Sequence, residues 1–358
     1  MKISIITMTS TYNYGATLQA YALQRFIQEL GHECNLIDHL SGVDKQRKIR
    51  LSNLSRDNLV KIPYKLILEK GYRKFENFYD THMNMTNRYA NMEELKSNPP
   101  DSDVFVVGSD QVWNPRDPKI DRFFLDFVPK DKCKISYAAS MGDPKLPDEL
   151  KEKYIEGLKS FSGISVREQE VYEILQDLTD KPIHINCDPA FLLTAEAWRE
   201  LETPVKGIEK NKYILCYLIY VPVWFNDWAK RFRKQTGLKI VFVGLDGYRS
   251  VYCDKYVRDA GIGEWLWLID NAKIVVSSSF HGNVFSLIFG KKLISMPDKN
   301  RPDRIHNLLR HFNEKNREVY DLDGHYEMTT INGQLVETIA ANDRLNAMGY
   351  LQRAFKSE

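Results

Sequence analysis

The segment Ile274–Ser295 reads IVVSSSFHGNVFSLIFGKKLIS. It begins with a short apolar run, Ile274–Ser277, which is typical of a buried strand and continues into two further serines. A helix is predicted from about His281 to Gly290, where the glycine ends it. A second short strand follows at Leu293–Ser295. A strand, a helix and a strand in this order favour the parallel sheets of α/β proteins.

The same alternation extends over most of the chain. We therefore predict an α/β fold made of two Rossmann-like domains with parallel sheets, which face each other across a cleft. A helix is expected at Thr17–Leu30, with Gly31 as its C-terminal cap. The first set of strands is predicted at Ile3–Met8, Asn35–Asp38, Val104–Val107, Ile135–Ala139, Ile164–Val166 and Ile183–Asn186. The second set is predicted at Tyr213–Ile219, Ile240–Val243, Ile274–Ser277, Leu293–Ser295 and Val319–Tyr320.

The segment Thr194–Asn211 separates the two sets of strands. It is polar and carries Pro204 and Gly207, so we place the domain boundary there. The first domain is predicted over 1–195, with a basic excursion at 41–90, and the second over 205–330. A helical tail at 331–358 could pack back on the first domain.

Composition excludes several classes of protein. The 358 residues carry a formal net charge of +2, without the strong basic excess of proteins that bind nucleic acid. The five cysteines are scattered and odd in number, which is typical of a reducing compartment. The histidines are dispersed without metal-ligand spacing, and no run of 18 apolar residues occurs. We expect a cytoplasmic protein without a metal or other cofactor.

One stretch departs from neutrality. Residues 45–74 hold ten Lys or Arg and two acids. A solvated helical excursion, whose apolar residues pack on the first domain, is the favoured interpretation. The alternative is a peripheral contact with the inner face of a membrane, where each basic residue contributes about 1 kcal/mol at most.

The predicted helix start near His281 is a candidate anion site. Unpaired backbone N–H groups and the helix dipole favour negative charge at such a position. Ser279 and Asn283 flank it, and Gly282 would let a ligand approach the backbone closely. The alternative is that His281 is a capping or buried structural residue.

Three further segments carry candidate residues at strand ends. Val104–Pro115 breaks at Gly108 and exposes Ser109 and Asp110, although Asp110 could instead cap a turn. Trp113 in this segment could stack on a sugar or fill the core. Arg167 suits bidentate binding of phosphate or carboxylate, and its alternative is a surface ion pair with Glu168 or Glu170.

The segment from Asn13 through Gly15 into the first helix resembles a phosphate-cradling loop but lacks the full glycine fingerprint. Asp188 follows another strand and is expected to cap the next segment, with a catalytic role as the alternative.

These segments, in this order, resemble the polysaccharide pyruvyl transferase family. The resemblance is carried by NYGATLQAYALQ, VVGSDQVWNP, SVRE, DPAFLL and SSSFHGNVFSLIFGKKLI, spread over residues 3–310. It implies the GT-B arrangement of two Rossmann-like domains, phosphoenolpyruvate as the donor, and a pyruvate ketal on a glycan as the product. The family's functional residues fall on His281, Arg167 and Asp110. Arg301 and Arg304 match basic residues after the His-Gly helix more loosely.

The expected reaction moves the pyruvyl group of phosphoenolpyruvate onto two hydroxyls of a sugar, in a glycan or a lipid-linked oligosaccharide. The catalytic candidates are His281, Asp110 and Arg167. The substrate-binding candidates are Asn13, Gly15, Ser109, Ser279, Gly282, Asn283, Arg301 and Arg304. A GT-B glycosyltransferase that uses a nucleotide sugar and a non-catalytic glycan-binding protein are the alternatives.

Overall fold

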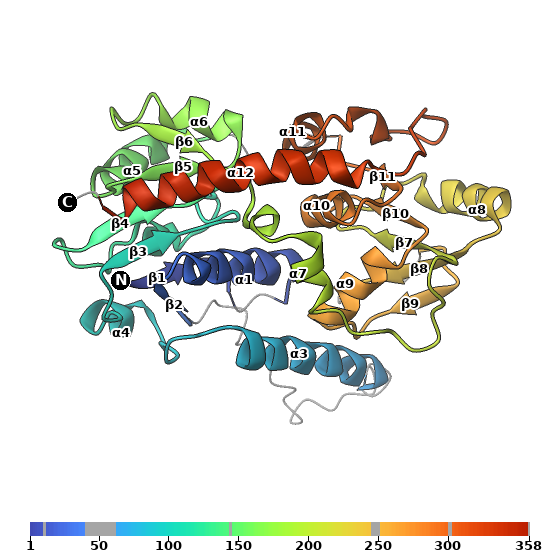
Figure 1. Ribbon diagram of the computed structural model, residues 1–358, viewed down its shortest axis with the longest axis horizontal. Coiled ribbons are helices and arrows are strands. Elements are labelled where there is room, and N and C mark those ends of the chain that lie inside the picture. Colours follow the sequence, from blue (N-terminus) through green and yellow to red (C-terminus); the bar gives the residue numbers. More distant parts are fainter. Residues whose placement is uncertain (10–11, 40–61, 143–144, 245–250, 300–302, 357–358) are drawn as a thin grey trace. The chain divides into compact units, whose positions relative to one another are not determined.

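A computed structural model describes residues 1–358 except 10–11, 40–61, 143–144, 245–250, 300–302 and 357–358 (Figure 1). The chain forms two compact units. The first unit consists of the described residues of Met1–Ile49, Tyr79–Leu193 and Ala340–Glu358. The second unit consists of those of Arg50–Phe78 and Thr194–Ile339.

The first unit is built on a parallel sheet with the strand order β2-β1-β3-β4. The pair β5-β6 continues it through single bridges from Ile135 to Gly163 and from Ala139 to Val166. Its strands are β1 (Lys2–Ile6), β2 (Glu33–Leu36), β3 (Val104–Val107), β4 (Cys133–Ser136), β5 (Ile164–Val166) and β6 (Ile183–Ile185). Its helices include α1 (Tyr14–Glu29), α4 (Met92–Ser97), α5 (Asp148–Lys159) and α6 (Gln169–Leu175), with the 3₁₀ turns η2 (Ile120–Phe124) and η3 (Pro189–Leu192).

The second unit contains a five-stranded parallel sheet with the order β11-β10-β7-β8-β9. Its strands are β7 (Tyr213–Tyr217), β8 (Lys239–Val243), β9 (Lys255–Val257), β10 (Ile274–Ser277) and β11 (Leu293–Ser295). Its helices include α7 (Ala195–Arg199), α8 (Phe225–Thr236), α9 (Ile262–Asp270), α10 (Phe280–Ile288), α11 (Asp303–His311) and the 3₁₀ turn η4 (Lys315–Arg317). All the paired strands within each sheet are parallel, so the predicted α/β class is confirmed.

Two strand predictions need correction. The strand β9 was not expected, because Lys255–Val257 is a short edge strand with little apolar character. The strand predicted at Val319–Tyr320 does not form. There, Glu318 makes a single bridge to Ser295 of β11.

Two helices extend over the boundaries of the units. Most of α3 (Ile62–His82) groups with the second unit, where Lys70 pairs with Asp259 at 2.8 Å and Lys74 pairs with Glu264 at 2.6 Å. This differs from the predicted bounds, which gave the whole basic excursion to the first domain. Residues 45–61 of the basic stretch lie outside the described residues.

The helix α12 (Gly333–Ala354) forms the tail, and from Ala340 onward it groups with the first unit. In that part, Tyr350 Oη donates to the carbonyl oxygen of Ser136 at 2.7 Å, and Arg344 Nη1 donates to that of Phe191 at 3.0 Å. The end of the chain is therefore held on the sheet of the first unit by specific hydrogen bonds.

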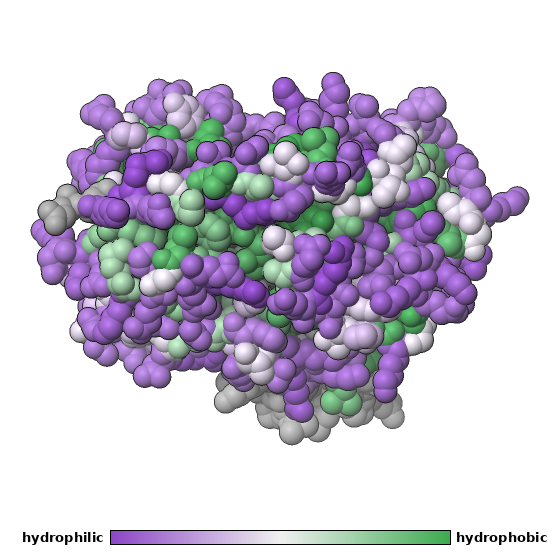
Figure 2. All heavy atoms as spheres, in the orientation of Figure 1, coloured by the Kyte–Doolittle hydropathy of each residue, from purple (hydrophilic) through white to green (hydrophobic). Residues whose placement is uncertain are grey.

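The face of the molecule in Figure 2 is covered mainly by hydrophilic side chains, with smaller hydrophobic areas between them. None of the described helices has both the length and the apolar character that crossing a membrane would require.

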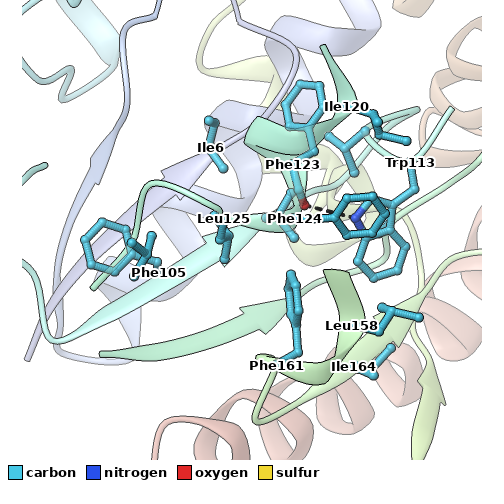
Figure 3. Packing of buried hydrophobic residues seen from close by; sticks show 14 of the residues in the cluster. Ile6, Phe105, Trp113, Ile120, Phe123, Phe124, Leu125, Leu158, Phe161 and Ile164 are labelled. Atoms are coloured by element: carbon cyan, nitrogen blue, oxygen red, sulfur yellow. Dashed lines mark hydrogen bonds between the residues drawn. The ribbon is translucent and has the colours of Figure 1, made fainter. Parts of the chain in front are cut away.

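The aromatic content of the first unit lies largely in its core (Figure 3). Trp113 is fully buried, stacks on Phe124 with ring centroids 6.0 Å apart, and donates from Nε1 to the carbonyl oxygen of Phe123 at 3.0 Å. Trp113 therefore fills the core and does not stack on a sugar. Removing such a side chain typically costs about 3–5 kcal/mol.

A titratable cluster lies at the amino edge of the second sheet, before β10 begins. Arg199 Nε contacts Asp270 at 3.0 Å, and Asn271 Nδ2 donates to Glu202 at 3.4 Å. Lys291 Nζ donates to the carbonyl oxygen of Asp270. Burial, and next the negative charge of Asp270, raise the pKa of Glu202 from 4.5 to about 7.

We predict that Glu202 makes the stability of the protein depend on pH. Between pH 4.5 and 7 the unfolded chain loses the Glu202 proton while the folded chain keeps it. The free energy of unfolding should therefore fall as pH rises through this window and level off above it. Urea unfolding at several pH values should show this decline, and Glu202→Gln should remove the part due to this group. Glu152→Gln, at an exposed position of α5, is the control. An unchanged slope in Glu202→Gln would contradict the assignment.

Candidate functional site

The turn between β10 and α10 is fixed by serine side chains. Ser277 Oγ donates to the carbonyl oxygen of Tyr217 at 3.0 Å and accepts the N–H of Ser279, also at 3.0 Å. Ser279 is the N-cap of α10, and its Oγ accepts the N–H of Gly282 at 3.4 Å. The run of serines thus ends the strand and starts the helix at a defined place.

His281 lies in the first turn of α10 and is 7% exposed. Its ring stands edge-on to that of Phe280, with centroids 5.3 Å apart. Backbone N–H groups at the start of a helix carry partial positive charge, so this turn favours an anion. The structure therefore places His281 at a helix start, as the sequence predicts.

Asn283 is a fully buried member of the same turn. Its Nδ2 donates to the carbonyl oxygen of Ser279 at 2.7 Å. Its Oδ1 has no hydrogen-bond partner among the residues that the structure describes. A buried acceptor of this kind is costly unless a donor satisfies it, so a hydroxyl or N–H donor would be stabilised here.

Gly282 is required by the packing of its own helix, and a ligand role for it stays a prediction. A Cβ at this position would lie 2.1 Å from Ser277 Oγ and 3.0 Å from Tyr217 Cδ1. The glycine is thus explained by the close packing of α10 against strands β7 and β10, and the approach of a ligand is not needed to explain it.

Arg304 belongs to α11 and reaches the same region. Its guanidinium carbon lies 5.9 Å from the centroid of the Phe280 ring. The structure therefore brings Arg304 to the side of α10, together with Ser279, His281, Gly282 and Asn283. Arg301 lies outside the described residues.

In the first unit, Ser109 is fully buried and does not face a ligand. Its Oγ donates to the carbonyl oxygen of Ala138 at 2.6 Å, and its N–H donates to Gln19 Oε1 at 3.1 Å. The expectation that Ser109 is exposed is therefore wrong, because the segment after β4 and helix α1 cover it. Asp110 is half-buried beside it and has a φ of +66°.

Arg167 follows β5 and is surrounded by carboxylates. Its Nε contacts Glu168 Oε1 at 2.8 Å and its Nη1 contacts Asp188 Oδ2 at 2.7 Å, all within the buried interior. Burial alone would lower the pKa of Arg167. Glu168, Asp188 and Asp110 outweigh it and raise that pKa above the ordinary value. The predicted ion pair with Glu168 exists, but it is buried and not at the surface.

Sequence reasoning missed the full extent of this cluster. Asp188 caps η3 by accepting the N–H of Ala190 at 3.0 Å, as expected, yet its second oxygen also holds Arg167. Glu168 has one oxygen on Arg167, and its Oε2 has no hydrogen-bond partner among the described residues. Because β5 and β6 are adjacent and parallel, residues following both strands meet at one edge. The sequence already predicted both strands, so the meeting of Arg167 and Asp188 could have been found from it.

Asn13 and Gly15 occupy the start of α1. The side chain of Asn13 is the N-cap and accepts the N–H of Gly15 at 3.0 Å and of Ala16 at 3.3 Å. Gly15 is buried within the helix. Both residues are thus accounted for by the capping of α1, and a ligand role for them stays a prediction.

Comparison with known proteins decides the family. A model of the family described as "Polysaccharide pyruvyl transferase" matches residues 13–300, most of the chain. The chain belongs to the polysaccharide pyruvyl transferase family. It is thus a member of a transferase family, as the sequence predicts. A comparison with curated protein sequences finds no match.

Among solved structures, the chain resembles UDP-N-acetylglucosamine 2-epimerase from Rickettsia bellii, with a TM-score of 0.50 and 10% identity over 99% of this chain and 98% of that one. UDP-GlcNAc 2-epimerase from Neisseria meningitidis has a TM-score of 0.46 and 11% identity, over 100% of this chain and 95% of that one. E. coli ADP-heptose lps heptosyltransferase II has a TM-score of 0.45 and 11% identity, over 99% of both. At these identities the likeness concerns the fold alone, and the GT-B-like class is confirmed.

The packing of Gly282 leads to a prediction on stability. In Gly282→Ala the new methyl group must displace Ser277 Oγ, which is hydrogen-bonded to the backbone of β7. Overpacking of this kind costs about 1–3 kcal/mol. Chemical unfolding should therefore show Gly282→Ala to be less stable than the parent protein by that amount.

Gly333→Ala is the matched control, because a Cβ there meets no atom within 4 Å. It should unfold within about 0.5 kcal/mol of the parent protein. Equal stability of the two variants would contradict the close packing at Gly282.

Proposed function

We propose that this family member transfers the pyruvyl group of phosphoenolpyruvate to two hydroxyls of one sugar, in a glycan or a lipid-linked oligosaccharide. The products are a pyruvate ketal and inorganic phosphate. The observation that carries the proposal is the family match over residues 13–300, which includes the β10–α10 turn and His281.

Donor binding is supported by the start of α10. Phosphoenolpyruvate carries a phosphate and a carboxylate, and a helix start with a nearby arginine favours both. The backbone of this turn, the imidazole of His281 and the guanidinium of Arg304 lie together in the second unit. We assign the donor to this group.

The chemistry requires balanced proton transfers. As the first sugar hydroxyl attacks C2 of phosphoenolpyruvate, its proton goes to a base, and the methylene carbon C3 takes a proton from an acid. The C2–O bond to phosphate then breaks with its electron pair on the phosphate. The second hydroxyl adds to C2 and gives up its proton. His281 and a carboxylate such as Asp110 suit these roles.

Arg167 is proposed to orient groups at the carboxyl edge of the first sheet. Its charge is already matched by Glu168 and Asp188, so it supplies less attraction for an anion than an isolated arginine would. Carboxylate oxygens accept hydrogen bonds from sugar hydroxyls. The cluster therefore suits hydroxyl groups, with Asp110 as a hydroxyl ligand or proton acceptor.

The site of action in the cell is also a proposal. A lipid-linked acceptor would bring a cytoplasmic enzyme to the inner face of the membrane, where residues 45–74 could contact anionic lipids. Neither a metal nor another cofactor takes part in the reaction as proposed, and nucleic acid is not a partner.

We predict that His281→Ala lowers phosphate release from phosphoenolpyruvate by about 100-fold or more, since general acid–base groups typically contribute that much. Phosphate should be measured with an acceptor glycan present and with unfolding curves that show the variant to be folded. His325→Ala, at an exposed position of the second unit, is the control and should keep its turnover.

Undiminished turnover in folded His281→Ala would contradict the catalytic assignment. A parent protein that binds a nucleotide sugar by calorimetry but never releases phosphate from phosphoenolpyruvate would instead indicate the glycosyltransferase alternative. Affinity for glycans without any turnover would indicate a binding protein.

A further inference from the structure

The loop that follows β7 exposes apolar side chains. Among the described residues of this loop, Ile219 is 55% exposed, Tyr220 37% and Val223 99%. The loop sequence from Leu218 to Trp224, LIYVPVW, contains no charged residue.

The loop is tied to the turn that holds the candidate donor site. The backbone N–H of Tyr220 donates to Ser278 Oγ at 2.9 Å, and Ser278 directly precedes the N-cap of α10. Tyr217 and Ser277 are register partners in adjacent parallel strands, so the chain leaves both strands at the same edge of the sheet. Tyr220 is therefore held beside the β10–α10 turn.

We propose that Tyr220 contacts the ring of the acceptor sugar and helps to determine which sugar is used. This inference rests on the proposed function. A sugar ring has an apolar C–H face and hydroxyls at its rim, and a tyrosine offers an aromatic face and a hydroxyl that match them. Such a contact costs little conformational entropy, because only two torsion angles of the tyrosine side chain become fixed.

The distribution of charge favours a neutral sugar at this loop. The anion-favouring features lie at the start of α10 and at Arg304, whereas the loop from Leu218 to Trp224 is uncharged. A membrane-binding loop would be expected to add Lys or Arg to its apolar residues. The donor thus occupies the turn, and the ring of the acceptor lies against Tyr220.

The test compares Tyr220→Ala and Tyr220→Phe with Val223→Ser, a change at the most exposed position of the same loop. The probes are the methyl glycosides of glucose, galactose, mannose and N-acetylglucosamine. Phosphate release is measured while glycoside and phosphoenolpyruvate are varied in turn. Saturation-transfer NMR measures glycoside binding without the donor.

We expect Tyr220→Ala to raise the KM for the preferred glycoside about three- to tenfold, the range that an aromatic contact typically gives. The KM for phosphoenolpyruvate should not change. Tyr220→Phe should keep most of the affinity, and Val223→Ser should match the parent protein. The NMR signal of the bound glycoside should fall in Tyr220→Ala in the same proportion.

An unchanged KM and NMR signal in Tyr220→Ala would overturn the proposal, as would a parent protein that binds none of the glycosides. Loss of sedimentation with phosphatidylglycerol vesicles in both Tyr220→Ala and Val223→Ser, with glycoside binding intact, would assign the loop to a membrane instead. If the parent protein binds a glycoside through Tyr220 but releases no phosphate, the proposed function fails while the sugar contact holds.

Discussion

The hydrogen bonds of Ser277 are the constraint on which the second unit depends. One hydroxyl joins the carbonyl of Tyr217, at the end of β7, to the N–H of Ser279, at the cap of α10. Because Gly282 has no side chain, α10 can pack against this hydroxyl. The position of His281 follows from these contacts: a helix that begins one residue later would turn the imidazole to another face.

The two units present different chemistry at the carboxyl edges of their sheets. In the second unit a helix start and Arg304 favour anions. In the first unit the guanidinium of Arg167 is enclosed by carboxylates, which suits hydroxyl groups better than a second anion. The proposed reaction involves both an anionic donor and the hydroxyls of a sugar, so each unit offers chemistry that this reaction can use.

Much of the fold could be predicted from the sequence because its apolar runs are followed by residues that typically end a strand. Val104–Val107 and Ile274–Ser277 are buried apolar runs that end in Gly108 and in serines, and the structure has strands with these bounds. The edge strand Lys255–Val257 was missed, since an edge strand needs little apolar character.

For the candidate residues, the sequence predicted the place in a helix or at a strand end better than the residues that each one contacts. His281 lies at a helix start, as the local pattern indicates. The burial of Ser109 could not be predicted, because Gln19, ninety residues earlier, accepts its N–H. The packing of Gly282 was likewise hidden, since it depends on how closely α10 lies against Ser277 of β10 and Tyr217 of β7. Contacts of this kind are set by the tertiary fold and leave no local signal.

Mass spectrometry of an acceptor glycan, after incubation with the protein and phosphoenolpyruvate, tests the central claim most directly. The glycan should gain the mass of one pyruvate ketal, with an equal amount of phosphate released, and the product should lose two reactive hydroxyls of a single sugar. An unmodified glycan, or one that has gained a sugar residue from an added nucleotide sugar, would contradict the claim.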